Sequence, residues 1–151
     1  MTTLDRHTAP TMANSDRAGW AGRVLSGLVV LFLVFDAGGK LIVPDLMIAH
    51  SPPLGLPADT GFYRVLGAIL ALCTLLYAIP RTAFLGAVLL TGYLGGAVAC
   101  HLRVGSPLLG FTLFGVYLGL AMWGGLWLRD GRVRALLPIV AGPSSGSQSG
   151  I

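Results

Sequence analysis

The sequence carries little charge for its length. Of its 151 residues, 11% are charged and 54% are hydrophobic. Soluble domains carry about 25% charged residues, so the composition excludes an ordinary water-soluble globule. The mean hydropathy of +0.78 indicates that lipid is the solvent for most of the chain, and the length suits a single domain.

Cysteine is also scarce, and the common catalytic motifs are missing from the sequence. The two cysteines, Cys73 and Cys100, allow at most one disulfide. They lack the C-x-x-C spacing of a redox motif and the ligand number of a structural zinc site. There is no Ser–His–carboxylate arrangement, phosphate-binding glycine loop or H-E-x-x-H motif. The sequence therefore predicts no catalytic residue and no metal, and it argues against a hydrolase or a nucleotide-driven protein.

The charged residues that are present are mainly basic, with ten Lys and Arg against six Asp and Glu and a formal net charge of +4. They lie mostly beside apolar stretches. They do not form the basic stripe with interleaved aromatics that is typical of a nucleic-acid-binding surface. We therefore predict no nucleic-acid partner, and we interpret the basic residues as determinants of membrane orientation.

Four apolar stretches dominate the chain, at about residues 20–43, 62–79, 82–102 and 108–128. Roughly 20 residues of helix, rising about 1.5 Å each, cross about 30 Å of hydrocarbon. A signal peptide is the alternative for the first stretch. Its apolar run continues past Asp36, however, and no small-residue cleavage site follows. The sequence thus predicts an all-α membrane protein, a four-transmembrane-helix bundle.

Polar segments flank this predicted domain of residues 20–138. Residues 1–19 are polar and of mixed charge, which is typical of a disordered arm. Residues 139–151 are rich in Gly and Ser, as in a flexible tail. Residues 44–61 contain four prolines, which exclude a continuous helix there. This loop lies either along the membrane surface or folded back into the mouth of the bundle.

The predicted orientation follows from the distribution of basic residues. Four spans place both termini on one side of the membrane. Seven of the ten Lys and Arg residues fall on that side, and Lys40, Arg64 and Arg103 fall on the other. Because cytoplasmic segments carry the excess of Lys and Arg, we expect both termini to be cytoplasmic.

Small residues recur at four-residue spacing in the last two spans. Gly92 and Gly96 share one helix face with Arg103, and Gly115 and Gly119 repeat the spacing in the fourth span. Such small-x-x-x-small patterns let helices approach closely. They predict helix packing within the bundle, with dimerisation as the alternative.

Charged residues from three spans lie toward the outer membrane face. Asp36 and Lys40 are spaced i,i+4 and can pair, and an unpaired aspartate at that depth is costly. Arg64 and Arg103 lie toward the same face. We predict a polar, mainly cationic mouth. It is either a structural ion pair with snorkelling arginines or a functional site for an anion, a lipid headgroup or the carbonyls of a quinone.

Helical phase separates Arg103 from its neighbours in sequence. On an ideal helix, His101 points about 160° away from Arg103. Cys100 lies on a third face, near Tyr93. A metal site built from Cys100, His101 and His50 would need an outward cysteine and a folded-in loop. Helical phase therefore favours Arg103 as a residue that lines the mouth, and it excludes Cys100 from the predicted cluster.

One long string carries a family resemblance. The string is IPRTAFLGAVLLTGYLGGAVA, residues 79–99, and it is followed by His101, Arg103 and Gly105. This stretch strongly resembles the DoxX-like family of small bacterial membrane proteins. The resemblance extends over roughly residues 24–138. It includes the strings GGKL, LGLP and LFGVYLGLAMWGGLWLRD.

The resemblance implies a four-helix, multi-pass protein of the bacterial inner membrane, and it retains His101 among the candidate residues. The family takes its name from a protein associated with a thiosulfate:quinone oxidoreductase, which implies a link to membrane redox systems. The sequence departs from the family pattern at Leu70, where many relatives have glutamate. It also departs at Cys100, often Thr, and at Phe111 and Gly115, often His and Pro. The missing acid argues against proton-coupled chemistry.

The sequence therefore predicts an integral membrane protein without a defined catalytic activity, an accessory subunit to a membrane redox system. The alternatives are a quinone-reactive redox subunit, with quinone as cofactor, and an oligomeric transporter of a small anion or solute. The predicted partners are the lipid bilayer and a redox partner or a second copy. The predicted functional polar cluster is Asp36, Lys40, Arg64, Arg103 and His101.

Overall fold

A computed structural model describes residues 9–50 and 54–136, and all regular secondary structure in these residues is helical. Four helical segments are long and apolar enough to cross a membrane: Arg17–Ile42, Thr60–Ala78, Ala83–Arg103 and Leu108–Arg129. They coincide with the four predicted stretches. The predicted class, an all-α protein with four membrane helices, is confirmed, and the cytoplasmic placement of both termini stays a prediction.

The first membrane helix, α1, runs from Ala9 to Ile42. It begins inside the segment 1–19 that the sequence predicts to be a disordered arm. Extending a helix is easier than nucleating one, so polar residues can continue a stable apolar helix in the N-terminal direction. Residues 1–8 and the predicted tail 139–151 lie outside the described residues.

Prolines end α1 and divide the loop after it. Pro44 has no backbone N–H with which to continue the helix, and it opens a short second helix, α2 (Pro44–His50), instead. Pro is well suited to a first helical position, where its missing donor costs nothing. The segment between the first two spans is therefore not one continuous helix, as its proline content predicts.

Helices α3 (Thr60–Ala78) and α4 (Ala83–Arg103) form an antiparallel hairpin. Asp59 caps the start of α3, where its side chain accepts a hydrogen bond of 2.8 Å from the backbone N–H of Phe62. Such a cap satisfies one of the donors that a helix leaves free at its start. The α3 helix ends before Pro80.

The fourth span begins with a π-helical turn, η1 (Leu108–Thr112), and continues as α5 (Phe114–Arg129). A last short helix, α6 (Gly131–Leu136), follows. Single π-helical turns inside helical segments often occur at functional sites. Here the turn places Phe111 and Thr112 on the wall of a cavity between the helices.

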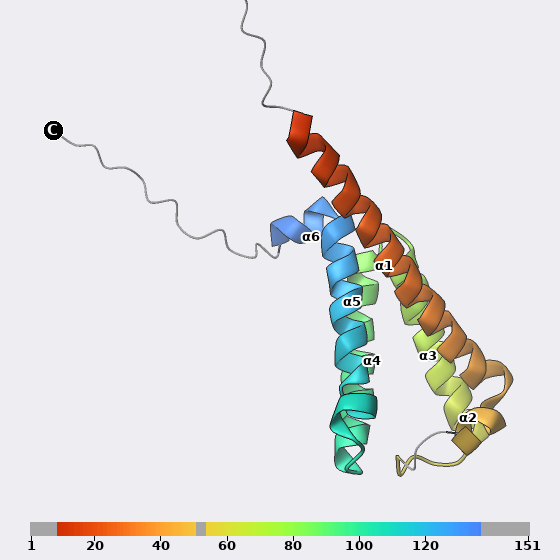
Figure 1. Cartoon of the computed structure of the whole chain (residues 1–151). Coiled ribbons are helices and arrows are strands. Elements are labelled where there is room, and N and C mark those ends of the chain that lie inside the picture. The colour runs from red at the N-terminus through yellow and green to blue at the C-terminus, as the bar shows by residue number, and fades with distance from the viewer. Residues whose placement is uncertain (1–8, 51–53, 137–151) are drawn as a thin grey trace, which may run out of the picture.

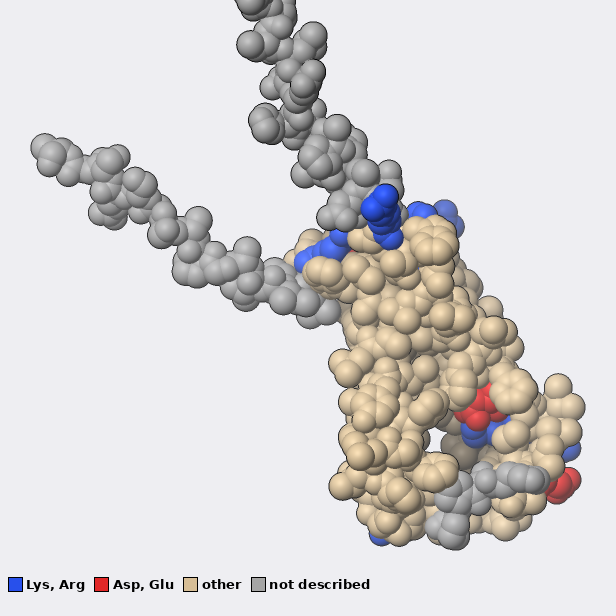
Figure 2. Space-filling view, in the orientation of Figure 1, with Lys and Arg blue, Asp and Glu red and all other residues tan. Residues whose placement is uncertain are grey.

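The four membrane helices form a ring in which α1 and α4 each contact both α3 and α5. Figure 1 shows the helices close together near α6 and farther apart toward α2. The bundle thus has a closed end and an open end. Lys and Arg gather at the closed end (Figure 2), where the exposed arginines are Arg17, Arg23, Arg81, Arg132 and Arg134.

Glycines allow the close contacts of the closed end. A Cβ atom on Gly22 of α1 would lie 2.8 Å from the carbonyl oxygen of Gly125 of α5, so neither helix could carry a larger residue there without moving. A Cβ atom on Gly86 of α4 would overlap the backbone of Tyr77. Backbone-to-backbone packing of this kind is what small residues provide in membrane bundles.

A buried tyrosine joins three helices at the same end. Tyr77 of α3 is fully buried, and its hydroxyl donates to the carbonyl oxygen of Met122 in α5 at 2.9 Å. The hydroxyl also lies 3.0 Å from Oγ of Ser26 in α1, and Arg129 donates to the Tyr77 carbonyl oxygen at 3.2 Å. We call Tyr77, Ser26 and Met122 the Tyr77 junction.

Candidate functional site

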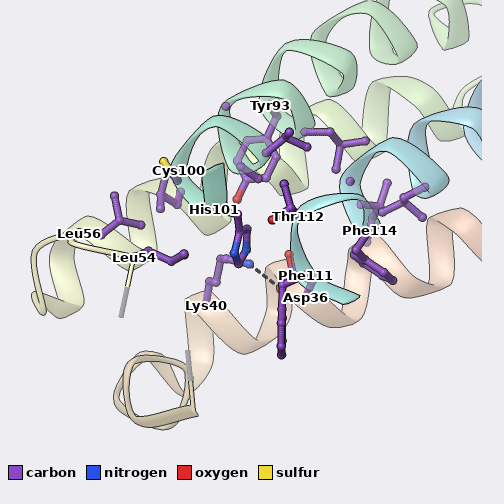
Figure 3. Close-up of a pocket in the computed structure, with 18 of the residues that line it drawn as sticks. Asp36, Lys40, Leu54, Leu56, Tyr93, Cys100, His101, Phe111, Thr112 and Phe114 are labelled. Carbon is purple, nitrogen blue, oxygen red and sulfur yellow. Dashed lines mark hydrogen bonds and ion pairs between the residues drawn. The ribbon is translucent and has the colours of Figure 1, made fainter. Parts of the chain in front are cut away.

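At the open end, the helices enclose a cavity of about 510 Å³. Residues of α1, α3, α4, η1 and α5 line it, together with residues from the segment before α3 (Figure 3). Most of the wall is aliphatic or aromatic. The side chains on it that can form hydrogen bonds or ion pairs are Asp36, Lys40, Tyr63, Tyr93, Cys100, His101 and Thr112.

An ion pair within α1 contributes the charged part of this wall. Lys40 Nζ lies 2.5 Å from Asp36 Oδ1, as their i,i+4 spacing predicts, and the two side chains are 17% and 31% exposed. Asp36 lies six residues before the end of the span at Ile42, which is about 9 Å along a helix. The pair brings both charges to the cavity while compensating each of them within the membrane span.

His101 faces the cavity from the last turn of α4 (Figure 3). Its Nδ1 lies 3.1 Å from Oγ of Ser106, and its ring stacks on Phe111 of the π-helical turn with a centroid separation of 6.1 Å. Thr112 donates to the Ser106 carbonyl oxygen at 3.2 Å. These contacts fix the imidazole against the wall, and no described residue forms a hydrogen bond with its other nitrogen.

Tyr93 is a functional candidate outside the predicted cluster. It lines the cavity two turns before His101, and Figure 3 shows its hydroxyl directed toward the space in front of Lys40 and His101. No described residue forms a hydrogen bond with this hydroxyl. The spacing of Tyr93, Ala97 and His101, four residues apart each time, was the available signal, because it keeps them within about 80° of one another around the helix.

The two arginines of the predicted cluster lie elsewhere. Arg64 is exposed on α3 and is not part of the cavity wall. Arg103 donates from Nη2 to the carbonyl oxygens of Leu54 and Gly55, at 2.8 and 3.2 Å. The predicted cationic mouth is therefore not a single cluster, since Arg103 is hydrogen-bonded to the segment before α3. Only Asp36, Lys40 and His101 of the predicted set meet at the cavity.

Cys100 also lies on the cavity wall, although ideal helical phase separates it from the packing face of α4. The wall covers a wide arc of this helix, which includes Gly92 and Gly96 as well as Cys100. Cys73 is buried in the bundle, and neither cysteine forms a disulfide.

The predicted packing glycines divide into two groups. A Cβ atom on Gly92 or Gly96 would meet no atom within 4 Å, so within one copy of the chain these glycines border the cavity and make no close helix contact. A Cβ atom on Gly115 would lie 3.0 Å from Cγ2 of Val98, so this glycine does pack against α4, while one on Gly119 would reach Leu94 only at 4.0 Å. The difference is not one of depth, because Val98, which Gly115 meets, lies nearer the open end than Gly92 and Gly96 do.

The fold and the site together define an integral membrane protein with four spans and a cavity between them. The family model of the DoxX-like family matches residues 24–125, which include every residue that lines the cavity. The chain belongs to the DoxX-like family and is an integral membrane protein of that type. No curated protein and no solved structure matches the chain.

Proposed function

We propose that this chain is a non-catalytic subunit that binds a small lipophilic molecule with a hydrogen-bonding head group, a quinone in the first instance. In this proposal it serves a redox partner in the bacterial inner membrane. The observation that carries the proposal is a cavity whose wall is mostly apolar and aromatic, with Lys40, Tyr93 and His101 directed toward one space in it (Figure 3).

The dimensions and chemistry of the cavity support such a ligand. Small-molecule sites occupy about 300–1,000 Å³ and combine apolar walls with a few placed polar groups, and this cavity measures about 510 Å³. A quinone carbonyl accepts hydrogen bonds, which Lys40, Tyr93 and His101 are chemically able to donate. The rings of Phe62 and Phe111 offer aromatic surface to a planar head group.

The same wall gives less support to an anion transporter. Arg64 and Arg103 lie outside the cavity wall, and the one cationic side chain on it, among the described residues, is paired with Asp36. An anion would find no uncompensated lysine or arginine in the cavity. An uncharged head group can use the donors of the pair without separating it.

The proposal predicts a specific role for the Tyr93 hydroxyl. Because a neutral hydrogen bond contributes about 1 kcal/mol, Tyr93→Phe is expected to weaken binding of a short-chain ubiquinone analogue about fivefold. Tyr117→Phe is the matched control, since Tyr117 is exposed on α5 and away from the cavity. The measurement is a titration of the purified chain in lipid nanodiscs, followed by isothermal calorimetry.

Two results would contradict the proposal. One is the lack of saturable binding by the unaltered chain with ubiquinone and menaquinone analogues. The other is an equal loss of affinity in the Tyr93 and Tyr117 variants, because that would place the binding outside the cavity.

A further inference from the structure

We infer that the cavity exchanges its ligand with the lipid phase, through an opening between α1 and the η1–α5 segment, while its water-facing end is closed by a strap that Arg103 holds. The strap is residues 54–56. This inference deepens the proposed function, on which it rests, because it restricts the ligand to uncharged molecules dissolved in the membrane.

The first observation is a hollow in the side of the bundle. Figure 2 shows it below the basic end, between the α5 side and the α1 side of the molecule, with acidic and basic side chains beside it. Phe32 of α1 and Phe114 of α5 both line the cavity, yet they are 40% and 45% exposed. Their rings meet edge to face with centroids 5.2 Å apart. The two rings therefore form an edge of the opening.

The opening lies within the thickness of the membrane. Phe32 belongs to the span Arg17–Ile42 and Phe114 to the span Leu108–Arg129. The exposed faces of such residues meet hydrocarbon, because the spans are of the length that crosses it. A molecule that enters past this edge comes from the bilayer.

The second observation is the strap at the other side of the cavity. Leu54 and Leu56 line the cavity, and they lie between the span that ends at Ile42 and the span that begins at Thr60. The strap therefore covers the cavity where the spans leave the membrane. Two leucines facing inward present an apolar barrier to water-soluble molecules on that side.

Arg103 fixes the strap from the end of α4. Its guanidinium donates to two successive carbonyl oxygens, those of Leu54 and Gly55, and hydrogen bonds with a charged donor are stronger than neutral ones. Gly55 has φ of +64°, a conformation that favours glycine. A Cβ atom at Gly55 would also lie only 2.8 Å from Arg103 Nη2. Arg103 is thus a positioning residue that acts through the strap and not through ligand contact.

A cysteine reporter on the cavity wall tests both routes. Ala97 lies between Tyr93 and His101 on the wall, so Ala97→Cys is introduced in a Cys100→Ser chain. Cys73 is buried, and the Cys100→Ser chain alone gives its background. Full-length protein in nanodiscs is labelled with an uncharged, lipid-soluble maleimide and, separately, with a charged, membrane-impermeant maleimide.

The two routes predict opposite responses. Phe32→Ala with Phe114→Ala is expected to accelerate labelling by the lipid-soluble reagent several-fold and to leave the charged reagent slow. Arg103→Ala is expected to accelerate the charged reagent several-fold and to leave the lipid-soluble one unchanged. Arg64→Ala is the matched control, because it removes an exposed arginine that does not contact the strap. Phe114→Leu serves as a milder variant if the double variant does not fold.

The outcomes separate the entry route from the proposed ligand, because labelling requires no quinone. Rapid labelling of the Ala97→Cys chain by the charged reagent before Arg103 is replaced would overturn the closed strap. If the lipid-soluble maleimide labels the folded Phe32 and Phe114 variants no faster than the unaltered wall, the lateral opening would be overturned. The expected labelling pattern without quinone binding would overturn only the proposed function, and quinone binding with the opposite pattern would overturn only the route.

Discussion

Asp36 and Lys40 place opposite charges inside the first membrane span, where an unpaired charge is costly. Their contact lies on the cavity wall, and both side chains are less than one-third exposed. Each charge therefore lowers the energetic cost of placing the other at that depth. Removing one partner has a different consequence from removing both, because a single removal leaves the remaining charge uncompensated.

A pair of variants tests this dependence. Lys40→Met is expected to lower the free energy of unfolding by about 2 kcal/mol, a value reduced from that of fully buried pairs because water reaches part of the site. Asp36→Leu combined with Lys40→Met is expected to recover most of the loss. Thermal unfolding in detergent measures both. A double variant no more stable than Lys40→Met would contradict the prediction.

At this scale the sequence predicts local pairs better than distant ones. The contact of Asp36 with Lys40 follows from four-residue spacing on one helix. The contact of Arg103 with Leu54 joins residues 49 positions apart, and nothing in helical phase indicates it. The position of Tyr93 was predictable from its spacing to His101, whereas the availability of its hydroxyl depends on how far the helices separate.

Within α4, two glycines have opposite surroundings. Gly86 lies against the backbone of Tyr77, whereas Gly92 faces the open space of the cavity. The same helix is therefore packed closely at one end and open at the other. A glycine at a close contact is required, while one in open space only reduces the stability of its helix.

Alanine variants of these two glycines are expected to change the stability of the protein in opposite directions. Gly86→Ala should lower the unfolding midpoint, because its Cβ atom would overlap backbone that cannot move aside cheaply. Gly92→Ala should raise stability by up to about 1 kcal/mol, the helix-propensity gain of alanine over glycine. Thermal unfolding compares them, with size-exclusion chromatography reporting the oligomeric state. Equal losses would mean that Gly92 packs against something, such as a second copy.

At the scale of elements, the four spans were predictable because length and apolar content define them. The π-helical turn at Leu108–Thr112 and the separation of the helices toward α2 were not, because both depend on packing between spans. Small-x-x-x-small spacing occurs at Gly115, which packs against Val98 of α4. It does not distinguish that contact from Gly92 and Gly96, which border a cavity.

As a whole, the molecule is asymmetric in charge. Five exposed arginines lie around the closed end, which carries α6, and Figure 2 shows most of the basic surface there. Lys and Arg are enriched on the cytoplasmic side of membrane proteins. The closed end is therefore expected to face the cytoplasm, and the strap to face outward.

Fusions to reporter proteins test this orientation in cells. Green fluorescent protein attached at the C-terminus is expected to fluoresce, and alkaline phosphatase attached there is expected to be inactive. Phosphatase attached after Val104, beyond the third span, is expected to be active, because that position lies at the opposite end. The reverse pattern of activity would place the closed end outside.

The Tyr77 junction has a consequence for how this protein can change over evolution. It joins α1, α3 and α5 through hydrogen bonds at 2.9 and 3.0 Å that involve no residue of the cavity wall. The junction thus holds three helices together at the closed end through groups that play no part in the cavity. Substitutions around the cavity can therefore alter which molecule is accepted while this junction stays in place. Such a scaffold can acquire new ligand preferences while its architecture persists.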